Sequence, residues 1–218
     1  MRFRDRRDAG QRLAAQLAGY AGRHDVVVLA LPRGGVAVAY EVARALGAPL
    51  DVFLVRKLGV PGHEELAMGA IASGDVRILN QDIVRALGIP ADVVERVATT
   101  ERAELERRER AYRTNRPPLD VRGRLVILVD DGLATGASMR AAVRAVRAAD
   151  AARLVAAVPV GAPETCAELQ PAVDEVVCAN TPDPFYSVGF WYEDFSQTTD
   201  HEVCDLLARA AREIPRAA

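Results

Sequence analysis

The sequence predicts an α/β fold, with a mainly parallel central sheet of about five strands and helices on both faces. Two segments indicate this fold, because 25–31 and 124–129 are, after the charged first residue of each, continuously apolar and rich in β-branched residues. Such runs are typical of strands that are buried on both faces of a parallel sheet. Each run ends at a glycine-containing turn that leads into a helical segment, at 36–46 and at about 138–148. Strands that alternate with helices in this way build parallel sheets.

The other elements follow in chain order from periodicity and from turn residues. A helix is expected over 4–21, because Leu13, Leu17 and Tyr20 recur at helical spacing. The further expected elements are a strand at 50–55, a loop at 56–63, a hairpin of 66–72 with 76–79, a short helix at 82–87, a long charged helix at 91–113 that Arg116, Pro117 and Pro118 end, strands at 154–160 and 173–178, a helix at 164–169 and a final helix from about 199.

Composition excludes several classes of protein. The 218 residues are 50% hydrophobic with a net charge of −2, which suits one folded domain and does not suit a disordered chain. No apolar run approaches the ~20 residues of a membrane span, and the charged segment 2–7 does not resemble a secretion signal. The near-neutral charge argues against a general nucleic-acid binder. We therefore expect a cytoplasmic protein with neither a membrane nor a nucleic acid as partner.

The segment 126–138 contains the strongest chemical signal. An apolar strand leads to the adjacent carboxylates of Asp130 and Asp131, and then to a glycine- and hydroxyl-containing turn before a helix. Free N–H groups at a helix N-terminus bind phosphate, and Thr135 and Ser138 add hydroxyl donors. The two carboxylates would accept hydrogen bonds from a sugar diol. The simpler alternative is an ordinary strand–turn–helix whose acid pair is solvated or caps the helix.

This segment resembles the phosphoribosyl pyrophosphate (PRPP) motif of type I phosphoribosyltransferases. The resemblance implies that Asp130 and Asp131 hold the ribose hydroxyls, and that Mg²⁺ bridges substrate oxygens, with these two carboxylates as its candidate protein ligands. The residues implied to bind the 5′-phosphate are Ala134, Thr135, Gly136, Ala137 and Ser138. The chain most resembles a bacterial group of predicted phosphoribosyltransferases without an assigned acceptor. It would form a single domain over 1–218, with a core at about 24–180 and a small hood built from the N-terminal helix and about 181–218.

Two further segments are candidate pyrophosphate-binding elements when they are considered together with that motif. Successive N–H groups of Arg33, Gly34 and Gly35 could form an anion nest, and the resemblance makes this segment the pyrophosphate loop. By the same resemblance Arg56 and Lys57 contact the pyrophosphate leaving group, so that they and Arg33 are the candidate catalytic residues. A tight structural turn and a pair of solvated charges are the plainer alternatives. Lys57 is notable because the other 27 of the 28 Lys and Arg residues are arginines.

A closing loop is expected over 59–65, where His63, Glu64 and Glu65 are candidate acid–base or metal-positioning groups. Six of the eleven aromatic residues lie within 185–195. Family members bind the acceptor base in a variable hood, often on an aromatic ring. The candidates here are Trp191, Tyr192, Phe185 and Tyr186, and the alternative is a small satellite core.

The resemblance implies transfer of the 5-phosphoribosyl group from PRPP to a nitrogen nucleophile, such as a nucleobase or related heterocycle, with release of pyrophosphate. The partners would be PRPP and a small-molecule acceptor, and a homodimer is a family expectation. The competing hypothesis is a non-catalytic regulator that binds PRPP or a nucleotide on the same fold. A phosphatase or hydrolase is disfavoured, because we find no pattern for its nucleophile.

Overall fold

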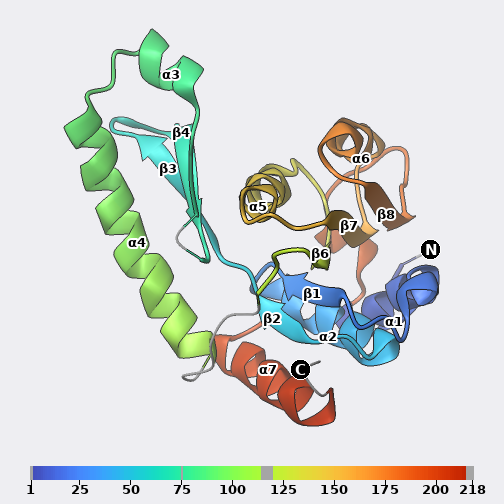
Figure 1. Cartoon of the computed structure of the whole chain (residues 1–218). Helices are drawn as coiled ribbons and strands as arrows, with labels where there is room; N and C mark the ends of the chain where they lie inside the picture. Colours follow the sequence, from blue (N-terminus) through green and yellow to red (C-terminus); the bar gives the residue numbers. More distant parts are fainter. Residues whose placement is uncertain (1, 75, 114–119, 215–218) are drawn as a thin grey trace.

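The computed structural model describes residues 2–74, 76–113 and 120–214 and is built around a five-stranded parallel sheet (Figure 1). Its strands lie in the order β2-β1-β6-β7-β8, and every neighbouring pair is parallel. Their bounds are β1 (Val26–Ala30), β2 (Leu50–Val52), β6 (Leu125–Val129), β7 (Arg153–Val160) and β8 (Glu175–Asn180). The predicted fold class and number of parallel strands are therefore confirmed.

Helices cover both faces of this sheet. The side chains of Val26 and Val28 belong to one apolar cluster, whereas Val27 and Leu29 belong to another, because successive residues of a strand point to opposite faces. The first cluster is closed by α1 (Arg6–Gln16), α2 (Gly34–Leu46) and α7 (Asp200–Glu213). The second is closed by α5 (Ala137–Ala148) and α6 (Pro163–Leu169).

Residues 55–74 and 76–113 form a second part of the molecule, which we call the arm. It contains a three-stranded antiparallel sheet of β3 (Val55–Val60), β4 (His63–Ala72) and β5 (Val76–Leu79), followed by α3 (Gln81–Ala86) and α4 (Ala91–Arg113). Figure 1 shows the arm extending away from the central sheet, with α4 alongside β3 and β4. The C-terminal end of α4 packs against α7 (Figure 1).

The arm confirms one expectation and corrects another. The hairpin of 66–72 with 76–79 is present as β4 and β5. The predicted loop at 56–63 is wrong, because these residues form β3, a tight turn and the start of β4. Leu58, Val60 and Met68 are buried there, so they supply the apolar surface that α4 covers. The sequence predicted a loop there because Gly59, Pro61 and Gly62 are residue types that are typical of loops.

The remaining elements are short. Within the described residues there are three 3₁₀ turns: η1 (Ala18–Tyr20), η2 (Gln170–Ala172) and η3 (Gly189–Trp191). Near the N-terminus, Phe3 forms a parallel bridge with Tyr192, which ties the start of the chain to its aromatic segment. The predicted helix stop at 116–118 lies outside the described residues. Among the residues that the structure describes, no helix is long and apolar enough to span a membrane.

Candidate functional site

The two glycine-containing loops meet at one edge of the central sheet. Because β1 and β6 are parallel neighbours, their carboxyl ends deliver 31–35 and 130–138 to the same place. A Cβ atom added to Gly34 would lie 1.9 Å from Oδ2 of Asp131, and one added to Gly35 would lie 2.9 Å from Cα of Asp130. The loops therefore touch, and only glycine allows so close an approach.

The acid pair occupies two different environments. The Asp130 carboxylate accepts a hydrogen bond from the backbone N–H of Asp131 at 2.8 Å. Burial, together with the neighbouring charge of Asp131, raises the pKa of Asp130 well above its usual range. Asp131 is instead bound through Oδ2 to Nε of Arg6 at 2.8 Å. The Tyr192 hydroxyl donates to the backbone carbonyl of Asp131 at 2.6 Å.

Two side chains hold the backbone of the 134–138 turn, while most of the turn itself is exposed to solvent. The Thr165 hydroxyl donates to the carbonyl of Ala134 at 2.7 Å, and the Arg140 guanidinium donates to the carbonyl of Thr135 at 2.6 Å. Gly136 has φ +69° and caps α5, and a Cβ there would lie 2.7 Å from the Thr165 methyl carbon. The side chains of Thr135 and Ser138 are exposed. This arrangement leaves the N-terminus of α5 accessible to an anion.

Arg33 lies where α2, α4 and α7 come together. Its guanidinium Nη1 is 3.7 Å from Oδ1 of Asp200, the first residue of α7. The Tyr112 hydroxyl of α4 donates to the same carboxylate oxygen at 2.6 Å. Burial and this carboxylate raise the pKa of Tyr112 to about 12. Asp200, which the sequence did not single out, thus connects the 33–35 loop to the arm.

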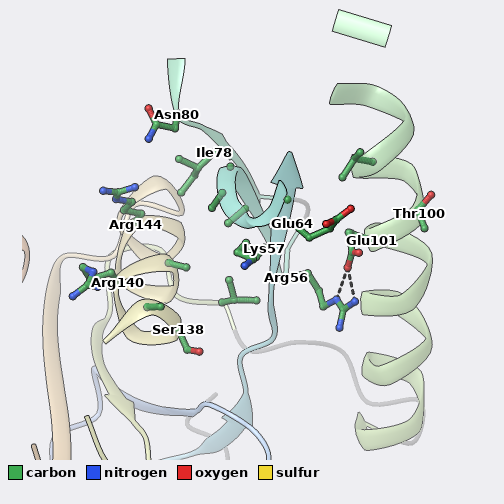
Figure 2. A pocket seen from close by; sticks show the side chains of 18 of the residues that line it. Arg56, Lys57, Glu64, Ile78, Asn80, Thr100, Glu101, Ser138, Arg140 and Arg144 are labelled. Carbon is green, nitrogen blue, oxygen red and sulfur yellow. Dashed lines mark hydrogen bonds and ion pairs between the residues drawn. The ribbon is translucent and has the colours of Figure 1, made fainter. Parts of the chain in front are cut away.

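Arg56 and Lys57 are successive residues of β3, so their side chains point in different directions. Arg56 faces α4 and donates from Nε to Glu101 at 2.6 Å (Figure 2). Lys57 is exposed and lines a cavity of about 1080 Å³ between the arm and α5. Ser138, from the end of the phosphate-type turn, lines the same cavity. Arg56 lines this cavity as well, so the two cations differ in that Glu101 holds Arg56.

The predicted closing loop over 59–65 is wrong as a loop. Val60 pairs with His63 across a tight turn that contains Gly62, at φ +80°. The carboxylate of Glu64 accepts a hydrogen bond from the backbone N–H of Gly62 at 3.1 Å, and backbone hydrogen bonds lower the pKa of Glu64. The side chain of Glu65 lies outside the described residues.

Comparison with known proteins gives the family. A sequence profile described as "Phosphoribosyl transferase domain" matches residues 4–192. The chain belongs to the phosphoribosyl transferase family.

Two relatives of this phosphoribosyl transferase domain come from strains of Mycobacterium tuberculosis, and one is named "Putative phosphoribosyl transferase Rv0571c". Each is 48% identical over 215 residues, which cover 99% of this chain and 48% of the relative. The chain thus spans about half the length of these curated relatives.

Solved structures agree on the fold. TT1426 from Thermus thermophilus superposes with a TM-score of 0.87 at 46% identity, covering 97% of this chain and 100% of that one. AQ2163 from Aquifex aeolicus superposes with a TM-score of 0.50 at 12% identity, covering 93% and 84% of the two chains. The second likeness concerns the fold alone.

The aromatic residues of this phosphoribosyl transferase domain divide between a small core and the surface. Tyr192 is buried against Phe3, with ring centres 5.4 Å apart, and Phe185 and Trp191 pack on the same cluster. Tyr186 is 68% exposed. The satellite core that we weighed as an alternative is therefore present, and the proposed contact with an acceptor stays a prediction.

Among the described residues, no group of three or more His, Cys, Asp or Glu side chains could hold a metal ion. Asp130 and Asp131 are the carboxylates that the acid-pair motif offers, and Arg6 already binds one of them. This donor set fits a Mg²⁺ ion held chiefly by oxygen atoms of a ligand. Arg6 itself was missed, because its partner lies 125 positions away in the sequence.

Proposed function

We propose that this chain is a phosphoribosyltransferase that binds PRPP and Mg²⁺ at the carboxyl ends of β1 and β6. One observation supports this most strongly: the 33–35 loop, the acid pair and the 134–138 turn lie side by side at one edge of the sheet. PRPP has a pyrophosphate, a ribose diol and a 5′-phosphate in matching order. Ligands of open α/β sheets bind at such an edge.

Each group of PRPP has a proposed partner in this arrangement. Asp130 and Asp131 accept hydrogen bonds from the ribose hydroxyls. Backbone and hydroxyl donors of 134–138 bind the 5′-phosphate, and the N–H groups of 33–35 bind the pyrophosphate together with Arg33. Lys57 approaches from the arm, whereas Arg56 must exchange its contact with Glu101 to take part.

The proposed reaction is displacement at C1′ of the ribose. The bond from C1′ to the pyrophosphate oxygen breaks, and its electron pair leaves with pyrophosphate. A nitrogen nucleophile forms the new bond to C1′ and releases its proton. Mg²⁺, when bound through the substrate, supplies neutralising charge for the leaving group. Arg33 and Lys57 are placed to stabilise the same developing charge.

Two measurements test the function. Calorimetry with PRPP and Mg²⁺ should show binding to the wild type and at least a hundredfold weaker binding to the Asp130→Asn/Asp131→Asn variant, roughly 2.7 kcal/mol or more. Circular dichroism should show that the variant remains folded. Equal affinity of the two proteins would overturn the site assignment.

The second measurement follows pyrophosphate release with PRPP, Mg²⁺ and a panel of nucleobases and related heterocycles. Release with any one acceptor supports the transferase. Tight PRPP binding without release across the panel would instead support the competing hypothesis, a regulator that binds PRPP without catalysis.

A further inference from the structure

Arg6, in the first turn of α1, sits in a socket built from distant parts of the chain. Its Nε lies 2.8 Å from Oδ2 of Asp131, and its Nη1 donates to the carbonyl of Ser196 at 2.7 Å. The guanidinium carbon lies 4.0 Å from the ring centre of Phe195. The Arg6 side chain is 12% exposed and that of Asp131 is 17% exposed. An arginine held on three sides is fixed in place, unlike a surface ion pair.

The socket lies at the junction of the two loops. A Cβ atom on Gly34 would be 2.9 Å from Nε of Arg6 as well as 1.9 Å from the Asp131 carboxylate. The guanidinium therefore touches the acid pair and the 33–35 loop together. The N-terminal segment is anchored there by backbone hydrogen bonds, from Phe3 to Trp191 and from Glu193 to Phe3, both at 2.8 Å.

The positive charge of Arg6 also acts on the buried carboxyl of Asp130. Burial and the neighbouring charge of Asp131 raise the pKa of Asp130, and the charge of Arg6 reduces that rise without reversing it. The Tyr192 hydroxyl faces the same pair, while Asp194 and Glu202 interact with Arg6 from its other side.

We propose that Arg6 is a positioning residue of the PRPP site, which holds Asp131 through Oδ2 and leaves Oδ1 for a ribose hydroxyl. This inference rests on the proposed function. It assigns to the N-terminal helix a part in substrate binding, through a side chain that acts on Asp131. The arginine stays in its socket when the ligand binds.

The test uses three variants of the full chain. Arg6→Met keeps most of the apolar length and removes the charge, and Arg6→Lys keeps the charge without the planar fork. Arg7→Ala is the matched control, because Arg7 is 70% exposed and pairs with Glu41 instead. Affinity for PRPP with Mg²⁺ is measured by calorimetry at one pH near neutrality, and the unfolding free energy of each variant is measured beside it.

Arg6→Met should weaken PRPP binding about tenfold, roughly 1.4 kcal/mol, because nothing then holds Asp131 through Oδ2. Arg6→Lys should recover part of that affinity, since it keeps a charged donor without the planar fork, and Arg7→Ala should match the wild type. Wild-type affinity in Arg6→Met would overturn the inference. Equal loss in Arg6→Met and Arg6→Lys would show a merely structural role, and tighter binding by Arg6→Met would show a competitor that the substrate displaces.

A ligand-free measurement separates this inference from the proposed function. Crystal structures of the ligand-free variants should show the Asp131 carboxylate displaced from the 33–35 loop in Arg6→Met and in its wild-type position in Arg7→Ala. If wild-type protein fails to bind PRPP, the proposed function fails while this comparison still tests the positioning role of Arg6. An unmoved Asp131 carboxylate in Arg6→Met would overturn the inference.

Discussion

The edge of the central sheet and the arm present candidate substrate-binding groups in opposite ways. At the sheet edge, Gly34 and Asp131 follow directly on buried strands, and their atoms are in close contact. In the arm, Lys57 is exposed beside a cavity of about 1080 Å³. The first region is preorganised by packing, whereas the second offers space across which the arm and α5 face each other.

This difference suggests a division of work within the proposed site. A rigid edge can fix the ribose and both phosphate groups, because its short loops leave little freedom. Cations on the arm depend on how the arm is held against the central sheet. One such link is the hydrogen bond between Tyr112 of α4 and Asp200 of α7. Substitutions in the two regions should therefore have different signatures.

The largest expected effect comes from Gly34→Ala at the rigid edge. The added methyl group would overlap the Asp131 carboxylate that Arg6 holds in place. Overpacking of this kind costs about 1–3 kcal/mol of unfolding free energy. PRPP affinity should fall roughly a hundredfold, about 2.7 kcal/mol. Denaturant unfolding and calorimetry provide the two measurements.

Gly19→Ala is the control for this substitution, because a Cβ atom at Gly19 would meet nothing within 4 Å. Its stability should change by less than about 0.5 kcal/mol. If Gly34→Ala behaved like Gly19→Ala in both measurements, the sheet edge would be more adaptable than its contacts indicate, and the contrast with the arm would fail.

A smaller, purely kinetic effect is expected from Lys57 in the arm. Lys57→Ala should slow PRPP-dependent pyrophosphate release by about 10- to 100-fold, since it removes charge stabilisation from the leaving group. The unfolding free energy should change by no more than about 0.5 kcal/mol, because the side chain is exposed. Lys57→Arg should retain part of the rate, since it keeps the charge with a different shape.

Arg77→Ala serves as the arm's control, because Arg77 on β5 pairs with Glu95 at the surface. It should leave the rate at the wild-type value. Wild-type turnover by Lys57→Arg would show that the single lysine reflects composition, and wild-type turnover by Lys57→Ala would remove the arm from the proposed mechanism.

The same contrast explains what the sequence could predict. β1 and β6 were predictable because they are continuous apolar runs, and the acid pair follows β6 directly. β3 was missed because Gly59 and the turn at 61–62 interrupt its alternation of apolar and polar residues. The apolar residues of β3 are buried only because α4 packs over them. Strand geometry then separates Arg56 from Lys57, which the sequence presents as a pair.

Long-range contacts were beyond the reach of local patterns. Arg6 is one of several arginines in a charged N-terminal segment, and no spacing rule connects it to Asp131. Asp200 was expected only as part of a helix start. Its contacts with Arg33 and Tyr112 join three elements that are far apart in the chain. Such partners are set by tertiary packing.

The smallest expected effect concerns the link between arm and sheet, at Tyr112. The pKa of Tyr112 is raised to about 12, so its neutral hydroxyl stabilises the fold as a donor to Asp200. Tyr112→Phe should lower the unfolding free energy by about 1 kcal/mol, the usual net value of a hydrogen bond. Denaturant unfolding at several pH values measures this difference.

The pH dependence distinguishes the hydrogen bond from lost packing. A raised pKa stabilises the folded state fully below the unfolded value of about 10, and that contribution disappears as the pH rises toward about 12. The gap between wild type and Tyr112→Phe should therefore close over this interval. Tyr186→Phe, at a tyrosine that is 68% exposed, should show no gap at any pH. A gap for Tyr112→Phe that persisted above about pH 12 would mean that the difference comes from lost packing and not from the hydrogen bond, because an ionised phenolate cannot donate to Asp200.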